Sequence, residues 1–227
     1  GSADGSTKAN KIYFLDTGVD FSLHPKFLNI QLGECRSFVE TERIRQDLNG
    51  HGTHVAGIAA AKQTTIGPGP GKPLCAGISA GAPIVSLKVL DKLGSGKWGY
   101  LISAFNHLAI EGKPGDVINL SLGAYGIASC EYSVPEMTSA INNLADKGLF
   151  IVMAAGNDAG DASLNYPGCI NGVVGTPGAN RIFTVGAIDC DDECSFYSNY
   201  DAAVVDWLAV GTNVLSLYPS LGSNIRF

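Results

Sequence analysis

Three short segments of the chain place an acid, a base and an amide donor beside apolar runs. The sequence FLDTGVD carries Asp16, the sequence NGHGTHVAGIAA carries His51 between two glycines, and the sequence AAGND carries Asn157. A carboxylate that orients an imidazole, an imidazole that moves a proton, and an amide that donates to an oxyanion are parts used in acyl transfer. The glycines around His51 would let a substrate backbone approach the ring closely.

Each of these residues also has an ordinary structural explanation. An Asp before Thr-Gly suits a turn, a His can sit at the start of a helix, and an Asn after Gly can adopt the left-handed conformation. His51 and His54 form an HxxH pair, but a zinc protease motif needs Glu after the first His, where this chain has Gly52. We therefore expect His54 to pack within a helix. It is the occurrence of all three residues together that favours acyl-transfer chemistry.

Apolar runs that alternate with helix-like segments indicate the elements that position these residues. Strands are expected at 12–15, 84–90, 117–122, 149–155, 182–188 and 204–208, and helices at 55–61, 98–110 and 137–147. Continuously apolar strands between helices predict a doubly wound α/β fold, a mostly parallel sheet with helices on both faces. Loops are expected at 65–73 and 159–178, where Gly and Pro are frequent.

This arrangement predicts where a ligand binds. Asp16 directly follows one expected strand, and Asn157 follows another by two residues. Ligands of open α/β sheets bind beyond the carboxyl ends of the strands. Both residues are therefore expected at the functional edge.

The bulk composition narrows the class of protein. With 227 residues, 45% of them hydrophobic, the chain is expected to form a single domain over residues 1–227. The net charge of −6 argues against nucleic acid or an anionic membrane as the main partner. No apolar run approaches the length of a membrane span. The chain begins at Gly1 without an apolar signal segment, which we interpret as the start of a mature, secreted or extracytoplasmic protein.

The chain has six cysteines, which leave three alternatives. An even number suits disulfide bonds in a secreted protein, whereas buried free thiols are the second reading. A zinc site is the third, but the chain has no CxxC pair. The pairing cannot be deduced from the spacing. The cysteines are Cys35, Cys75, Cys130, Cys169, Cys190 and Cys194.

Several blocks together resemble the subtilisin-like serine proteases, the subtilases. They follow that family's order of Asp before His, and the similarity extends over residues 11–218. The stretch at 195–200 is similar to the proteinase K branch. The blocks are DTG at 16–18, HGTHVAG at 51–57, SLG at 121–123, AAGN at 154–157 and, more weakly, AVGTNVLS at 209–216.

The resemblance implies a serine endopeptidase that cleaves peptide bonds through an acyl-enzyme, without an organic cofactor. Asp16 would orient His51, His51 would act as general base and then general acid, and Asn157 would donate to the oxyanion. Peptide or protein substrate would pair with an edge strand, and a propeptide would assist folding. The substrate-binding residues implied are Ser121, Leu122, Gly123, Ala154, Ala155 and Gly156.

The family's nucleophilic serine lies in a Gly-Thr-Ser-Met-Ala block, which this chain lacks. The sequence around Thr212 precedes an apolar run instead, and Ser223 has no following small-residue helix. We expect the serine and the last part of the fold on a C-terminal segment that is missing or is a separate chain. The alternatives are a truncated, inert fragment and a catalytically inactive module that only binds peptides.

Structural calcium is also implied by the resemblance. One familiar site of the family is not matched, because the chain has HPKF at 24–27 where an Asp would be expected. A second candidate combines the Asp206 carboxylate with backbone oxygens near Pro177, since Ca²⁺ prefers oxygen ligands. The alternative is that Asp206 is an ordinary carboxylate at a strand end.

Overall fold

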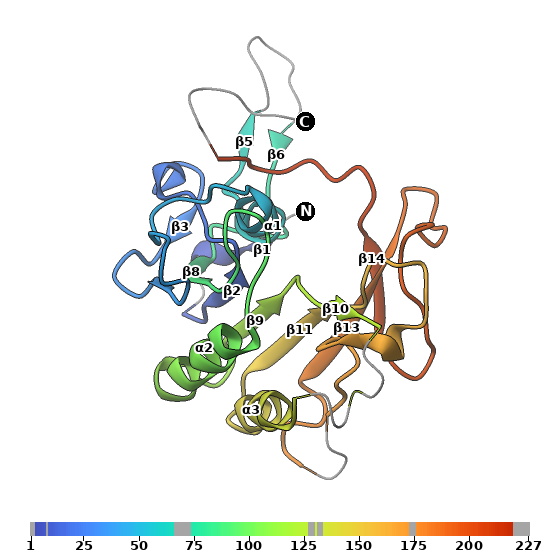
Figure 1. The fold of residues 1–227 in the computed structure, drawn as a ribbon. Coiled ribbons are helices and arrows are strands. Elements are labelled where there is room, and N and C mark those ends of the chain that lie inside the picture. The colour runs from blue at the N-terminus through green and yellow to red at the C-terminus, as the bar shows by residue number, and fades with distance from the viewer. Residues whose placement is uncertain are drawn as a thin grey trace. The chain divides into compact units, whose positions relative to one another are not determined.

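The computed structural model describes residues 3–7, 9–65, 74–126, 130, 134–172 and 176–219 (Figure 1). The loop expected at 65–73 lies outside these residues except for its first position. The chain divides into two compact units, one of residues 1–100 with 215–227 and one of residues 101–214. The single domain expected over residues 1–227 stays a prediction, and each unit is described by itself.

The first unit is built on parallel strands around β8 (Pro83–Lys88). Strand β2 (Ile12–Asp16) pairs with β8 in parallel, with Asp16 beside Lys88. The short strands β3 (Asn29–Ile30) and β4 (Arg36–Ser37) also pair with β8 in parallel. Every residue of β8 is buried, as expected for a strand covered on both faces.

Helix α1 (His51–Ala60) packs against β2 and β8. Its buried positions are held by small residues such as Ala56 and Gly57, which allow a close approach of helix and sheet. The sequence placed the start of this helix at Val55, four residues late. The first turn is poor in helix-favouring residues, and side chains from elsewhere stabilise it, as shown below.

The second unit contains four parallel strands in the order β9 (Val117–Leu120), β11 (Phe150–Ala154), β13 (Ile182–Ile188) and β14 (Trp207–Val210). The strand expected at 204–208 begins only at Trp207. Val204 and Val205 instead belong to a turn, because both of their amides donate to the carbonyl of Asp201.

Two amphipathic helices accompany these strands. Helix α2 (Trp98–Glu111) buries residues at helical spacing, as does α3 (Pro135–Asp146), which begins with Pro at a position that tolerates it. The Lys147 ammonium donates to the Ala109 carbonyl, so the ends of α2 and α3 lie together. The buried residues are Leu101, Ala104, Phe105 and Leu108 of α2, and Met137, Ile141, Leu144 and Ala145 of α3.

The remaining elements are short. Among its described residues, the segment 159–178, expected to be irregular, holds only η3 (Ala162–Leu164) and the two-residue β12. The other short elements are β1 (Ala3–Asp4), η1 (Gly5–Thr7), η2 (Phe21–Leu23), β5 (Thr64–Thr65), β6 (Leu74–Cys75), β7 (Ser79–Ala80), β10 (Ala124–Tyr125) and β12 (Asn165–Tyr166). The predicted α/β fold with mostly parallel strands is confirmed.

The cysteines include both a disulfide bond and free thiols, two of the three alternatives considered from the sequence. Cys130 and Cys169 form a disulfide bond in the second unit, with 39 residues of separation. Cys35, Cys75, Cys190 and Cys194 are free thiols. Among the described residues, no helix is both long and apolar enough to cross a membrane.

Candidate active site

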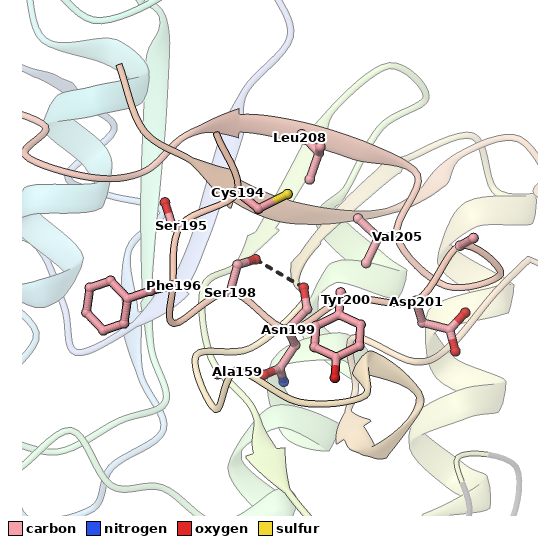
Figure 2. A pocket seen from close by; sticks show the side chains of 11 residues that line it. Ala159, Cys194, Ser195, Phe196, Ser198, Asn199, Tyr200, Asp201, Val205 and Leu208 are labelled. Carbon is pink, nitrogen blue, oxygen red and sulfur yellow. Dashed lines mark hydrogen bonds between the residues drawn. The ribbon is translucent and has the colours of Figure 1, made fainter. Parts of the chain in front are cut away.

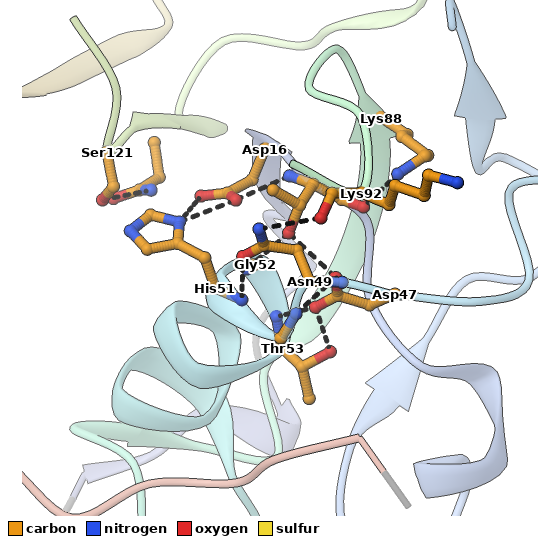
Figure 3. A network of polar contacts seen from close by, with 12 residues as sticks. Asp16, Asp47, Asn49, His51, Gly52, Thr53, Lys88, Lys92 and Ser121 are labelled. Atoms are coloured by element: carbon orange, nitrogen blue, oxygen red, sulfur yellow. Dashed lines mark hydrogen bonds and ion pairs between the residues drawn. The ribbon is translucent and has the colours of Figure 1, made fainter. Parts of the chain in front are cut away.

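Asp16 and His51 lie in direct contact in the first unit (Figure 3). The Nδ1 atom of His51 lies 2.8 Å from Oδ1 and 3.0 Å from Oδ2 of Asp16. Asp16 is fully buried at the end of β2, whereas the His51 side chain is 48% exposed. Since a carboxylate only accepts hydrogen bonds, Nδ1 carries the proton and Nε2 of the neutral ring is left to accept one.

The contact with Asp16 changes the basicity of His51. The hydrogen bond to Asp16 raises the pKa of His51 above its ordinary value, partial burial opposes this, and the charges of Asp16 and Asp47 add to the increase. The ring is therefore a stronger base than a free histidine, which suits a group that must take a proton and later return it.

Thr17 connects Asp16 to the helix that carries His51. Its amide donates to Asp16 Oδ1 at 2.6 Å, and its hydroxyl donates to Asp47 Oδ1 at 2.9 Å. The same hydroxyl accepts the amide of Gly52 at 2.9 Å. One buried residue, through its backbone amide and its hydroxyl, therefore fixes the position of the carboxylate relative to the start of α1.

The first turn of α1 is capped by three separate side chains. The amides of a helix's first turn have no partner inside the helix, and Gly50 at the N-cap offers no side chain. Asn49 Oδ1 accepts the amide of His51, Thr17 accepts that of Gly52, and Asp47 Oδ2 accepts that of Thr53. This network explains why a glycine-rich segment begins a helix at His51.

Asp47 is the centre of this network (Figure 3). It is only 2% exposed and also accepts the Gly50 amide at 2.8 Å and the Thr53 hydroxyl at 2.7 Å. Its negative charge near the helix N-terminus is favourable for the helix dipole as well.

Gly52 is required by this close packing. A Cβ atom at Gly52 would collide with the carbonyl oxygen of Gly18 and lie 3.0 Å from Oδ1 of Asp16. The glycine after His51 therefore lets the helix approach the strand that carries the acid.

Asn157 lies in the second unit, on a loop after β11, with an exposed side chain. Asn199, which is 1% exposed, holds this loop (Figure 2). Its Oδ1 accepts the amides of Asp158 and Gly160, and its Nδ2 donates to the Ala155 carbonyl. Asn199 thus fixes the backbone on both sides of Asn157 and leaves the Asn157 amide exposed.

The predicted substrate-binding residues follow two paired strands of the second unit. Ser121, Leu122 and Gly123 come directly after β9, which pairs in parallel with β11, and Ala154 ends β11. The expected strand at 117–122 thus ends at Leu120. The carbonyls of Ala154, Ala155 and Gly156 accept hydrogen bonds from Asn165 or Asn199.

A pocket of about 480 Å³ lies beside Asn199 (Figure 2). Its lining includes Ala159, Phe196 and Leu208 together with small polar side chains. None of the predicted substrate-binding residues belongs to the lining. We therefore assign no catalytic role to this pocket.

The two residues proposed for calcium both have other partners. Asp206 Oδ2 accepts the Thr184 amide at 2.8 Å, and the Pro177 carbonyl accepts the Arg181 guanidinium. A calcium ion at that carbonyl would have to displace the Arg181 guanidinium. No group of three or more His, Cys, Asp or Glu within the described ranges could hold a metal. The calcium site stays a prediction, which a change of melting temperature on chelation would test.

Reasoning from sequence did not find Thr17, Asp47 and Asn199, which hold the site residues in place. It also did not find Lys88, whose ammonium donates to the Thr17 carbonyl. Their contacts join positions far apart in the chain, and no local pattern marks such contacts. A local signal was present only for Lys88, a lysine that closes β8, whose other residues are apolar apart from Ser86.

Comparisons with known proteins point to one family. Residues 7–225 match the model of the Subtilase family. The chain is 35% identical over 218 residues to an intracellular serine protease of Paenibacillus polymyxa, covering 92% of this chain and 58% of the relative. It is also 35% identical over 218 residues to thermitase of Thermoactinomyces vulgaris, covering 96% of this chain and 68% of that protein.

A solved structure shows the same fold. A cold-adapted subtilisin-like serine proteinase superimposes with a TM-score of 0.72 and 28% identity, covering 96% of this chain and 68% of that one. The first curated relatives are thus matched over about 60% of their length. The family match, the shared fold and the contact between Asp16 and His51 together show that the chain belongs to the subtilase family of serine proteases.

Proposed function

We propose that the protein is a serine endopeptidase and that this chain supplies its acid, its base and one oxyanion donor. Asp16 holds the imidazole of His51 through Nδ1, which leaves Nε2 to take the proton of a serine hydroxyl. His51 then returns that proton to the leaving amine when the acyl-enzyme forms.

The observation that carries this proposal is the contact between the buried Asp16 carboxylate and the half-exposed His51 ring. A general base must reach the group whose proton it takes, and the 48% exposed His51 side chain is accessible. Removal of this acid in subtilisin, which belongs to the same family, lowers kcat about 3 × 10⁴-fold.

We further propose that Asn157 donates its amide to the oxyanion and that the segments 121–123 and 154–156 bind the peptide. The exposed Asn157 side chain on a loop held by Asn199 supports the first role. The position of both segments at the carboxyl ends of paired strands supports the second.

The nucleophilic serine is proposed to come from outside residues 1–227. No Gly-Thr-Ser-Met-Ala block occurs in these residues, and the curated relatives are longer than the region matched. A propeptide that assists folding is proposed from the same family resemblance.

A secreted or extracytoplasmic location is proposed from the bond between Cys130 and Cys169, because disulfides persist in oxidising compartments. Two of the relatives are intracellular serine proteases by name. Mass analysis of protein alkylated without reductant tests this proposal, since a reduced pair in freshly isolated protein would oppose it.

A fluorophosphonate probe tests the proposed activity. The full-length protein is treated with the probe and its peptides are mapped by mass spectrometry, with His51→Ala as the control variant. We expect one adduct on a serine outside residues 1–227, strongly reduced in the control. No adduct on folded full-length protein would contradict the proposal and favour a module that binds peptides without cleaving them.

A further inference from the structure

Lys88 is a fully buried lysine at the end of β8, and the proposed chemistry does not use it. Its exposed fraction is 0%, and Lys residues are almost never fully buried unless they are paired. The Lys88 ammonium lies 2.9 Å from Glu42 Oε2 and donates to the Thr17 carbonyl at 2.5 Å. A desolvated cation is costly to retain, so its contacts indicate what it does.

The partner of this cation is an ionised carboxylate. Burial raises the pKa of Glu42, but the Lys92 amide and the Lys88 ammonium lower it, and the net pKa lies below the usual range. The Lys92 amide donates to Glu42 Oε1 at 2.9 Å, which anchors the side chain. The pair is therefore a fixed, charge-neutral unit.

Lys88 acts on the segment that bears the catalytic acid. Strands β2 and β8 place Asp16 beside Lys88, and the amides of Val89 and Leu90 both donate to the Asp16 carbonyl. The amide and hydroxyl of Thr17 are already bound to Asp16, Asp47 and Gly52. The carbonyl of Thr17 is its third polar group, and Lys88 holds it.

We infer that Lys88, neutralised by Glu42, is a positioning residue that holds the Thr17 peptide and thereby keeps the Asp16 carboxylate against His51. Without the ammonium, the Thr17 carbonyl loses its partner and the Thr17–Gly18 peptide can rotate. Because the Gly18 carbonyl packs directly against Gly52, this rotation would displace the start of α1 and separate Nδ1 of His51 from the Asp16 carboxylate. The inference rests on the proposed role of the Asp16–His51 pair.

The test follows the pKa of His51 by NMR in the full-length protein, a measurement that does not depend on turnover. The variant Asp16→Asn gives the pKa that His51 has without the Asp16 carboxylate. Lys88→Met removes the ammonium with little change in shape, and Glu42→Gln with Lys88→Met removes both charges. Lys11→Met is the matched control, since it breaks an ion pair with Glu34 at 2.6 Å that is partly exposed and in the same unit.

The two possible effects of Lys88 have opposite signs. If Lys88 acted only through its charge, its removal would raise the pKa of His51, and the double variant would leave it nearly unchanged. If Lys88 positions Asp16, both variants lower the pKa of His51 to values between those of the native chain and Asp16→Asn. We expect this second result, and we expect the pKa of His51 in Lys11→Met to equal that of the native chain.

A pKa of His51 that rises or does not change in Lys88→Met would overturn the inference. If Lys88→Met alone fails to fold because Glu42 is left unpaired, the double variant decides the question. Failure of both to fold, with Lys11→Met folded, would show a purely structural role and also overturn it. An unchanged pKa in Asp16→Asn would instead contradict the proposed function, so the two failures are distinguishable.

Discussion

The network around Asp47 makes a quantitative prediction about the stability of the first unit. Asp47→Asn keeps the shape of the side chain but replaces one carboxylate oxygen by an NH₂ group. Oδ1 accepts the amides of Asn49 and Gly50 and the Thr17 hydroxyl, whereas Oδ2 accepts the amide and hydroxyl of Thr53. Whichever way the new amide turns, its NH₂ group faces at least one backbone N–H.

The cost follows from these contacts. A buried donor left without a partner costs about 1–3 kcal/mol, and weakening the charge-assisted bonds at the remaining oxygen adds about 1 kcal/mol. We therefore expect Asp47→Asn to lower the free energy of unfolding by about 2–4 kcal/mol. This is a large part of the stability of an ordinary domain.

The assay is urea unfolding at neutral pH, followed by tryptophan fluorescence. The chain has two tryptophans, Trp98 in the first unit and Trp207 in the second. Trp207 is 64% exposed, so Trp207→Phe is a mild background in which Trp98 is the remaining tryptophan of residues 1–227.

Asp20→Asn is the matched control. Asp20 caps η2 by accepting the Ser22 amide, and Asn caps as well as Asp does. We expect the control to change stability by no more than about 0.5 kcal/mol. If Asp47→Asn cost no more than this control, the proposed capping of α1 by Asp47 would be wrong.

Three further predictions concern the pH dependence, the glycine packing and the disulfide. Because the pKa of His51 is raised in the folded chain, its protonation stabilises the fold below the unfolded pKa, and this contribution is lost as pH rises through the folded pKa. The urea midpoint should therefore fall as pH rises from the unfolded to the folded pKa of His51. In His51→Gln, this part of the pH dependence of the midpoint should be absent. Gly52→Ala should lower the free energy of unfolding by about 1–3 kcal/mol, because the new Cβ would collide with the backbone carbonyl of Gly18. Gly99→Ala, where the space at Cβ is open, should be neutral or slightly stabilising. Equal urea midpoints for the two variants would refute the packing argument. Replacing both Cys130 and Cys169 by Ser should cost about 4 kcal/mol for a loop of 39 residues, and a melting temperature of the native chain that is indifferent to reductant would contradict this.

The pair formed by Asp16 and His51 was predictable because its signal is local. Asp16 and His51 are marked by adjacent glycines and apolar runs, and both lie at the ends of elements that periodicity predicts. Strands β2 and β8 were predictable for the same reason, since their burial is nearly continuous along the chain.

The supporting residues were not predictable, because their contacts cross long stretches of sequence. Lys88 reaches Thr17 over 71 positions and Thr17 reaches Asp47 over 30. The start of α1 was misplaced for a related reason, since its first turn is stabilised by side chains outside the helix rather than by its own propensity. The start of β14 was misplaced because the β-branched Val204 and Val205 favour a strand locally, while Asp201 binds their amides in a turn.

The most direct test of the account measures the pKa of His51 itself. The chain has four histidines, so the His51 ring resonances can be assigned by comparison with His51→Gln and then titrated by NMR. The account predicts a pKa above that of a free histidine, a proton on Nδ1 of the neutral ring, and the loss of both in Asp16→Asn. A His51 that titrates at its ordinary value and is indifferent to Asp16→Asn would contradict the claim that these two residues form the acid–base pair of a serine protease.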